Sequence, residues 1–366
     1  MEQLKAFLKR KNIVISAKRY GIDALGAMAQ GLFCSLLIGT IINTLGEQLG
    51  IPFLVDVGSY ASAMSGAAMA VAIGYALQAP PLVLFSLVTV GYAANALGST
   101  SLIPDQAGAG GPLAVLFIAV IAAEFGKAVS KETKIDILVT PLVTILVGVG
   151  LSAWWAPAIG TAATAVGNII MWATDLQPFL MGIVVSVVIG VALTLPISSA
   201  AICAAFGLTG LAGGAAVAGC CANMVGFAVL SFRENRWGGL VSQGLGTSML
   251  QMPNIVRNPR IWLPAILTSA ITGPLATCVF HLEMNGPPVS SGMGTCGLVG
   301  QIGVWTGWLA PSERAIANGA VAITPGVMDW AGLILISFVL PAVLCWAFGL
   351  FFRRIGWIKE GDLTLE

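Results

Sequence analysis

The residue types best suited to chemistry lie together in one stretch from His281 to Cys296, with the sequence HLEMNGPPVSSGMGTC. It holds the only histidine of the 366-residue chain, followed closely by Glu283 and Asn285. An imidazole and a carboxylate can relay a proton or hydrogen-bond the hydroxyl groups of a ligand. In an extended segment leading into Pro287-Pro288, both side chains can point into one cavity. The alternative is an interfacial turn in which both groups simply meet water.

The composition places these residues in a membrane protein. Hydrophobic residues make up 57% of the chain, charged residues only 9%, and the mean hydropathy is +0.92, whereas an ordinary soluble domain carries roughly a quarter charged residues. Several apolar runs reach the ~18–20 residues that a spanning helix needs, and one of them is expected at about 137–155. Residues 196–233 are expected to make either two short crossings or one re-entrant dip. With Lys and Arg marking cytoplasmic loops, the sequence predicts an all-α polytopic membrane protein with about eight to ten transmembrane helices, two or three re-entrant hairpin segments and both termini in the cytoplasm.

The basic residues are concentrated at the start of the chain, where six of the 17 Lys and Arg lie within the first 20 residues. Residues 1–20 are therefore predicted to form a basic amphipathic cytoplasmic segment, either along an anionic inner leaflet or as a solvated tail. The apolar stretch that follows is too long for a cleaved signal, so we expect this segment to be retained. The transmembrane domain is expected over residues 21–352, and a cytoplasmic tail over residues 353–366.

Three stretches interrupt the apolar helices: residues 195–199 (LPISS), residues 244–254 (GLGTSMLQMPN) and the stretch from His281. Non-helical backbone survives at membrane depth only when it is buried in protein or lines a watery cavity. The second and third stretches share the pattern Gly-x-Gly-Thr-x-x-Leu, at 244–250 and at 292–298, which suggests an internal repeat. Paired interruptions of this kind point to a solute site in a transporter, because their amides and carbonyls can bind substrate.

We therefore expect a ligand to bind where the three interrupted segments meet. The candidate substrate-binding residues are His281, Glu283, Asn285, Ser198, Ser199, Thr247 and Asn254. Other amides within apolar runs, such as Asn223 and Gln301, are predicted to bridge helices.

One further acid, Glu124, lies in an apolar run with Lys127 three residues later, a helical i, i+3 spacing. It is interpreted either as a salt bridge at the end of a helix or as a proton carrier, a role also open to Glu283. A single histidine cannot build a cluster of metal ligands, and no nucleophile has a convincing base. The seven cysteines show no CxxC spacing and are predicted to pack as small residues. No catalytic residue, metal or cofactor is therefore predicted.

Together these features resemble the membrane IIC component of the sugar phosphotransferase system. The resemblance rests on the basic leader, LVTPLVTILVGVGL at 138–151, LPISSAA at 195–201 and TGPLATCVFHLEMNGPP at 272–288, and it covers about 22–350. The chain also resembles stand-alone IIC-like proteins known as perfringolysin O regulators.

The resemblance implies a homodimer in the bacterial inner membrane, with a scaffold part and a moving substrate part that carries a sugar or sugar derivative inward. The sequence lacks the Gly-Ile-Thr-Glu motif of typical sugar-binding members and has no room for a IIB cysteine or IIA histidine domain. Any phosphoryl donor would then be a separate IIB or IIA protein, and whether the chain serves an enzyme stays open. The expected partners are a small polar solute, membrane lipid, a second copy and these phosphotransfer proteins, and no nucleic acid. The alternative is a membrane regulator that keeps the transporter fold but signals through a partner.

Overall fold

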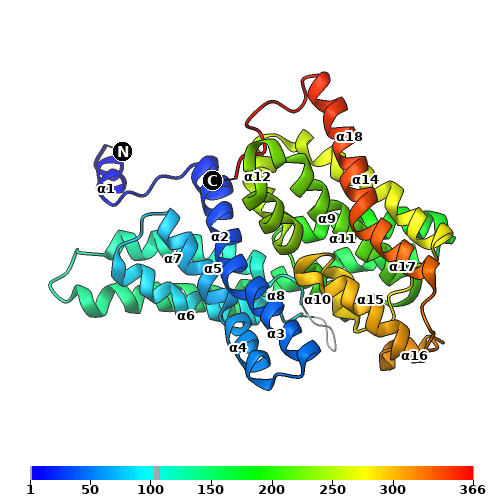
Figure 1. The fold of residues 1–366 in the computed structure, drawn as a ribbon. Helices are drawn as coiled ribbons and strands as arrows, with labels where there is room; N and C mark the ends of the chain where they lie inside the picture. The colour runs from blue at the N-terminus through cyan, green and yellow to red at the C-terminus, as the bar shows by residue number, and fades with distance from the viewer. Residues whose placement is uncertain (1, 103–107, 366) are drawn as a thin grey trace. The chain divides into compact units, whose positions relative to one another are not determined.

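The computed structural model describes residues 2–102 and 108–365, and its contacts divide the chain into two compact units, residues 1–163 and 164–366 (Figure 1). Within these described residues the regular elements are helices, apart from one isolated antiparallel bridge. Residues 1 and 366 of the predicted terminal segments lie outside the described residues. The predicted limits of those segments stay predictions.

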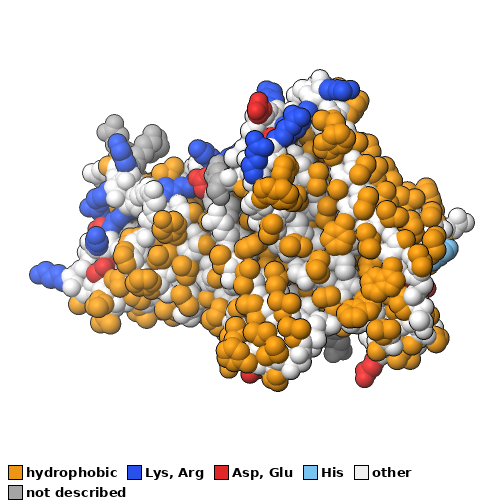
Figure 2. Space-filling model, in the orientation of Figure 1, with side chains coloured by type: hydrophobic (Ala, Val, Ile, Leu, Met, Phe, Trp, Pro, Cys, Tyr) orange, Lys and Arg blue, Asp and Glu red, His pale blue; other side chains and the backbone are white. Residues whose placement is uncertain are grey.

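In the part of the chain that the structure describes, seven helices are long and apolar enough to cross a membrane. They are Arg19–Leu49, Pro81–Gly98, Gly111–Val129, Asp136–Thr174, Gly210–Leu230, Pro259–Val279 and Val327–Arg354. Pro52–Ala63 and Ser65–Ala76, bent by 46°, would together form an eighth, and Pro178–Thr194 is a shorter apolar helix. Hydrophobic side chains cover much of the face shown in Figure 2, as expected for helices that contact lipid. The predicted all-α polytopic membrane fold is confirmed.

The first unit is built around α5, which packs against α2, α6 and α7. Its helices are α1 Glu2–Arg10, α2 Ala24–Leu32, α3 Ile38–Leu49, α4 Pro52–Ala63, α5 Ser65–Ala76, α6 Pro81–Gly98 and α7 Gly111–Val129. Proline begins α4 and α6, where its missing N–H would have had no helical partner. Gly50 ends α3 in the left-handed conformation, with φ +66°.

Helix α8 is longer than the sequence predicted. An apolar span was expected to end near residue 155, but α8 runs over Asp136–Thr174 and includes Pro141 and Pro157. At 1.5 Å per residue its 39 residues extend roughly 58 Å, well beyond one crossing of the ~30 Å hydrocarbon core. The start of this helix was predicted correctly and its end wrongly, because a spanning helix was expected to stop after the ~20 residues of one crossing.

The basic leader is held on the first unit by hydrogen bonds at the end of α5. Arg19 donates to the Leu77 carbonyl over 2.6 Å, and Lys127 donates to the same carbonyl over 3.1 Å and to the Asn12 carbonyl over 2.7 Å. The Asn12 side chain also donates to the Gln78 side chain over 2.6 Å. Two cations thus satisfy a carbonyl at the C-terminus of α5, where the helix dipole favours positive charge.

A carboxylate between α7 and α8 holds the leader at a second point. Arg10 pairs with Glu132 at 2.8 Å, and Lys11 pairs with the same carboxylate. The hydrogen bond from Lys11, reinforced by the charge of Arg10, lowers the pKa of Glu132 below its usual value. Because the folded-state pKa is lowered, this contribution is present above the ordinary Glu pKa of ~4.3 and is lost as the pH falls through the folded-state pKa.

Replacing Glu132 with glutamine mimics its protonation, so the Glu132→Gln variant should release the leader at neutral pH. We expect trypsin to cleave after Arg10 and Lys11 faster in this variant than in wild type, as followed by mass spectrometry. Asp175→Asn neutralises an exposed acid in the other unit and should leave the cleavage rate unchanged. Equal rates in all three proteins would show that Glu132 does not hold the leader.

The second unit is built around α11 (Gly210–Leu230), which packs against α9, α14 and α18. The other helices after α8 are α9 Pro178–Thr194, α10 Ser199–Ala205, α12 Phe232–Val241, α13 Met252–Arg257, α14 Leu263–Pro274, α15 Val299–Leu309, α16 Glu313–Ala317, α17 Val327–Ile334 and α18 Leu340–Arg354. The region 196–233, expected to make two short crossings or a re-entrant dip, instead forms the short α10 and the full-length α11. α11 is largely surrounded by protein, since 89% of an 18-residue stretch of it is buried.

Glycines let the neighbours of α11 approach its backbone closely. A Cβ at Gly219 would overlap the carbonyl group of Ser186 in α9, and a Cβ at Gly214 would overlap the carbonyl of Leu282. Small residues at helix contacts are typical of membrane proteins, where van der Waals packing drives helix association. The glycine-rich run of α11 is therefore a packing surface.

Candidate functional site

The stretch from His281 to Cys296 begins as non-helical chain, with His281 itself in the left-handed conformation (φ 45°). Its side chains alternate as in a strand, with Leu282 and Met284 buried (2% and 0% exposed) and His281 and Glu283 exposed. The backbone N–H and carbonyl of Met284 both bond to Gly210 at the start of α11, each over 3.0 Å. His281 and Glu283 therefore share the outward side of this chain, and their role in binding stays a prediction.

Asn285 ties the same stretch to α11 through its side chain. Its amide nitrogen donates to Glu283 Oε2 over 2.9 Å, and its oxygen accepts from the Gly210 N–H over 3.2 Å. Only 5% of Asn285 is exposed. Its geometry fits orienting the Glu283 carboxylate, and direct contact with a ligand stays a prediction for this residue.

The structure brings the three interrupted segments together in the second unit, where hydrogen bonds from these segments or the residue next to them link each pair. Thr194, just before the first segment, bonds to Ser248 of the second over 2.8 Å. Ser199 of the first segment donates to the Gly292 carbonyl of the third over 2.7 Å. Thr295 of the third segment donates to the Gly244 carbonyl of the second over 2.5 Å. Parts of the second and third segments also pack against α11. The convergence expected from the sequence is therefore present.

The second segment is a helix that breaks and then resumes. After α12 the chain passes through a π-helical turn, Ser242–Gly246, to the extended residue Thr247 (φ −157°, ψ 143°). A 3₁₀ turn, Ser248–Gln251, then leads into α13. In the matching motif of the third segment, Thr295 likewise precedes a 3₁₀ turn, Cys296–Leu298, that leads into α15. At both places the threonine of the motif thus precedes a 3₁₀ turn that leads into a helix, although Thr295 (φ −85°, ψ 5°) is not extended as Thr247 is.

The remaining candidate residues make local hydrogen bonds within these segments. Ser198 caps α10 by accepting from the Ala201 N–H, and Thr247 accepts from the Met249 N–H, both over 3.1 Å. Asn254 is only 4% exposed and bonds within the second segment. Such bonds stabilise the breaks in the helices, and contact of these residues with a solute stays a prediction.

Asn223 of α11 lies fully buried at the centre of a polar network that the sequence indicated only as a bridge between helices. Its amide nitrogen donates to the Gly219 carbonyl (3.1 Å) and to Ser269 (3.2 Å). Its oxygen accepts from Thr194 (3.2 Å) and from the Trp262 indole (3.0 Å). Two donors and two acceptors are the full capacity of the amide. Through Thr194 the network reaches the second interrupted segment.

A second buried amide has a side-chain oxygen that can still accept a hydrogen bond. Gln301 of α15 is 8% exposed and donates to the Cys221 sulfur over 3.3 Å, while its oxygen has no hydrogen-bond partner among the described residues. A buried acceptor left unpaired costs about 1–3 kcal/mol, so a polar ligand or a water molecule at this oxygen would be stabilising. The sequence signal for this position was an isolated glutamine in an apolar run.

Glu124, the candidate proton carrier, lies in the first unit, whereas the other candidates lie in the second. It is 2.9 Å from the Lys127 ammonium one helical turn later, and it accepts from the Tyr20 hydroxyl over 3.1 Å. Lys127 is only 1% exposed. This arrangement matches the salt-bridge interpretation, and a role in carrying protons stays a prediction.

Sequence comparison links this arrangement of helices to a known family. The family described as "Phosphotransferase system, EIIC" matches residues 22–365, which include all three interrupted segments. No curated protein matches the chain, and no solved structure matches it. A match over nearly the whole chain, on an all-α fold with several membrane-spanning helices, establishes the relationship. The chain therefore belongs to the EIIC family of the phosphotransferase system and is a membrane transporter component.

Proposed function

We propose that the protein binds a small polar solute, a sugar or sugar derivative, and carries it across the bacterial inner membrane. The observation that carries this proposal is the meeting of three interrupted segments in the second unit. Interrupted helices leave amides and carbonyls without helical partners, and such groups are what a polar solute needs at membrane depth. The unpaired oxygen of buried Gln301 supports a polar ligand nearby.

The finer assignments follow from charge and from the family. Basic residues cluster at both ends of the chain, which favours cytoplasmic termini. Membership of the EIIC family favours a homodimer that works with separate IIB and IIA proteins, which would supply any phosphoryl group. The chain's own role is to bind and move the solute.

The test is a thermal-shift screen of the purified protein against sugars, sugar phosphates and small anions. A ligand at 100 times its dissociation constant stabilises the folded state by ~2.7 kcal/mol, which the screen would detect. Each hit is repeated on His281→Ala and Glu283→Ala, whose exposed side chains can be removed without opening a cavity. Glu313→Ala removes another exposed acid of the same unit and serves as the matched control.

A solute that stabilises wild type and Glu313→Ala, but neither of the other variants, would place binding at the stretch that begins with His281. An equal shift in all four proteins would place binding elsewhere, with Gln301 as the next position to replace. Uptake of the same solute into liposomes then separates the two functions left open by the sequence. Binding with no uptake would contradict transport and favour a membrane regulator.

A further inference from the structure

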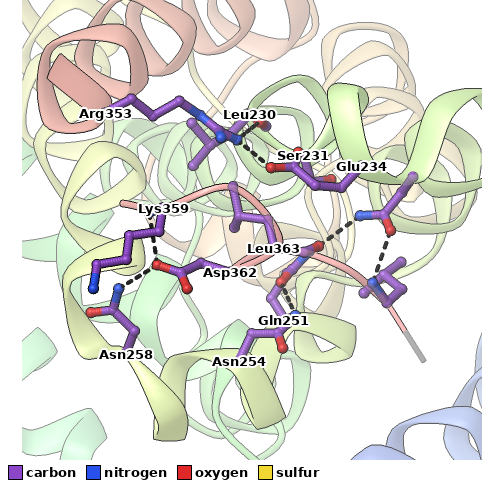
Figure 3. A network of polar contacts seen from close by, with 12 residues as sticks. Leu230, Ser231, Glu234, Gln251, Asn254, Asn258, Arg353, Lys359, Asp362 and Leu363 are labelled. Atoms are coloured by element: carbon purple, nitrogen blue, oxygen red, sulfur yellow. Dashed lines mark hydrogen bonds and ion pairs between the residues drawn. The ribbon is translucent and has the colours of Figure 1, made fainter. Parts of the chain in front are cut away.

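The C-terminal tail, residues 356–365, folds back onto the second unit after α18 ends (Figure 3). Ile358 and Leu363 are buried (2% and 0% exposed), while Lys359 and Glu360 between them are exposed. A buried leucine near the end of a chain indicates a docked segment, because termini are poorly ordered unless they are tied down.

Amide side chains hold the tail by its backbone. Asn235 of α12 donates to the Leu363 carbonyl over 2.7 Å and accepts from the Leu365 N–H over 2.8 Å. Gln251 donates to the same Leu363 carbonyl over 3.0 Å, and Asn254 donates to the Thr364 carbonyl over 2.9 Å. These bonds resemble the way a peptide is bound along a groove, with main-chain contacts for affinity and buried side chains as anchors.

A fourth amide fixes the beginning of the tail. Asn258, just after α13, donates to the Trp357 carbonyl over 2.9 Å and to the Asp362 carboxylate over 2.8 Å. Figure 3 shows the side chains of Gln251, Asn254 and Asn258 next to the tail, with their bonds to it as dashed lines. The tail is therefore held near both of its ends.

Gln251 and Asn254 belong to the second interrupted segment. Gln251 also donates to Gln243 over 2.9 Å, and Gln243 donates over 2.8 Å to Ser231 at the end of α11. The tail is thus connected through side chains to the segment whose Ser248 and Gly244 meet the other two. A movement of this segment away from α11 would have to break the contacts with the tail or carry the tail along.

The contacts are few enough to break. Between its ends the tail lies over a hollow of about 580 Å³, lined by charged side chains that include Arg233, Glu234 and Arg353. Two buried anchors and a handful of hydrogen bonds give a local stability well below that of the helical core, so the tail can open without unfolding the protein.

We propose that the C-terminal tail is a releasable strap: docked, it holds the second interrupted segment in place, and released, it frees this segment to move. For its consequence in transport the proposal rests on the proposed function. The strap itself is a property of the fold and can be tested without any solute.

The test is hydrogen–deuterium exchange of the full chain in lipid nanodiscs, followed by mass spectrometry. Leu363→Asp places a charge in the buried anchor, and Asn235→Ala, a milder change, removes two backbone contacts. We expect amide exchange to rise by about tenfold in residues 356–365 and in residues 243–254 of both variants. Glu360→Ala changes an exposed side chain of the tail and should leave exchange in both regions unchanged.

Faster exchange in the tail with unchanged exchange in 243–254 would overturn the proposal, as would unchanged exchange in the tail of Leu363→Asp. Uptake of a solute found by the thermal-shift screen gives a separate readout. If the strap restrains transport, the released variants take up solute faster than Glu360→Ala, and equal rates would refute that restraint. If no solute is found, the proposed function fails, and the exchange data still decide whether the strap exists.

Discussion

Replacing Gly219 with alanine should lower the free energy of unfolding by about 2–3 kcal/mol. The new methyl group would overlap the backbone carbonyl of Ser186 in α9, and a backbone atom cannot move aside as a flexible side chain can. α9 and α11 would have to separate, which weakens the packing along their whole contact. The shift in the unfolding midpoint of the purified protein in detergent measures the effect.

The matched control is Gly238→Ala in α12, because no atom lies within 4 Å of a Cβ at that position. Alanine has the better helix propensity, so this variant should be as stable as wild type or slightly more stable. If Gly219→Ala unfolded at the same midpoint as Gly238→Ala, the close approach of α9 to α11 would be wrong.

Replacing Asn223 with leucine should lower the free energy of unfolding by about 2–3 kcal/mol, although leucine has a similar volume. The Trp262 indole would lose its 3.0 Å acceptor and Ser269 its 3.2 Å contact, both inside the packed second unit. The change is measured in the same unfolding assay. Asn318→Leu, at an exposed asparagine with one side-chain bond to Thr209, should change stability by less than about 0.5 kcal/mol.

A double-mutant cycle separates the lost hydrogen bonds from any misfit of the leucine. Trp262→Phe removes the indole N–H that Asn223 satisfies, so the combined variant should lose less stability than the two single changes added together. Strict additivity would mean that the two side chains are not coupled, and would contradict the network.

Hydropathy and charge were sufficient to predict the fold class, whereas the family was predicted from the resemblance of short motifs such as those at 195–201 and 272–288. Apolar runs of sufficient length define spanning helices, and the interruption at 195–199 and the repeated motif marked where helices break. The far end of α8 was missed because one crossing of the membrane was expected to need only ~20 residues, whereas α8 continues through Pro157 to Thr174. The full-length α11 was missed because the distribution of Lys and Arg made residues 196–233 begin and end on the same side, which favoured two short crossings or a dip.

For the site, the sequence predicted which segments meet but not which atoms join them. The bond between Ser199 and the Gly292 carbonyl spans 93 residues, and no periodicity encodes such a pairing. His281 and Glu283 were singled out by their chemistry, and the structure places them on an exposed side of a non-helical chain. The four side-chain hydrogen bonds of Asn223 could not be inferred, because the sequence of an apolar helix does not show how many partners an asparagine within it has.

The way in which amide side chains bind the tail has a consequence for how the tail sequence can vary among related proteins. Asn235 and Leu363 are 128 residues apart, and the contact between them uses only the main chain of the tail. Most tail side chains can therefore change, provided that bulky apolar residues remain at 358 and 363 and that a side chain at 362 still accepts from Asn258, as Asp362 does. In related chains the tail sequence would then vary although its docking is kept. Conservation is expected instead at the residues that bind its backbone: Asn235, Gln251, Asn254 and Asn258.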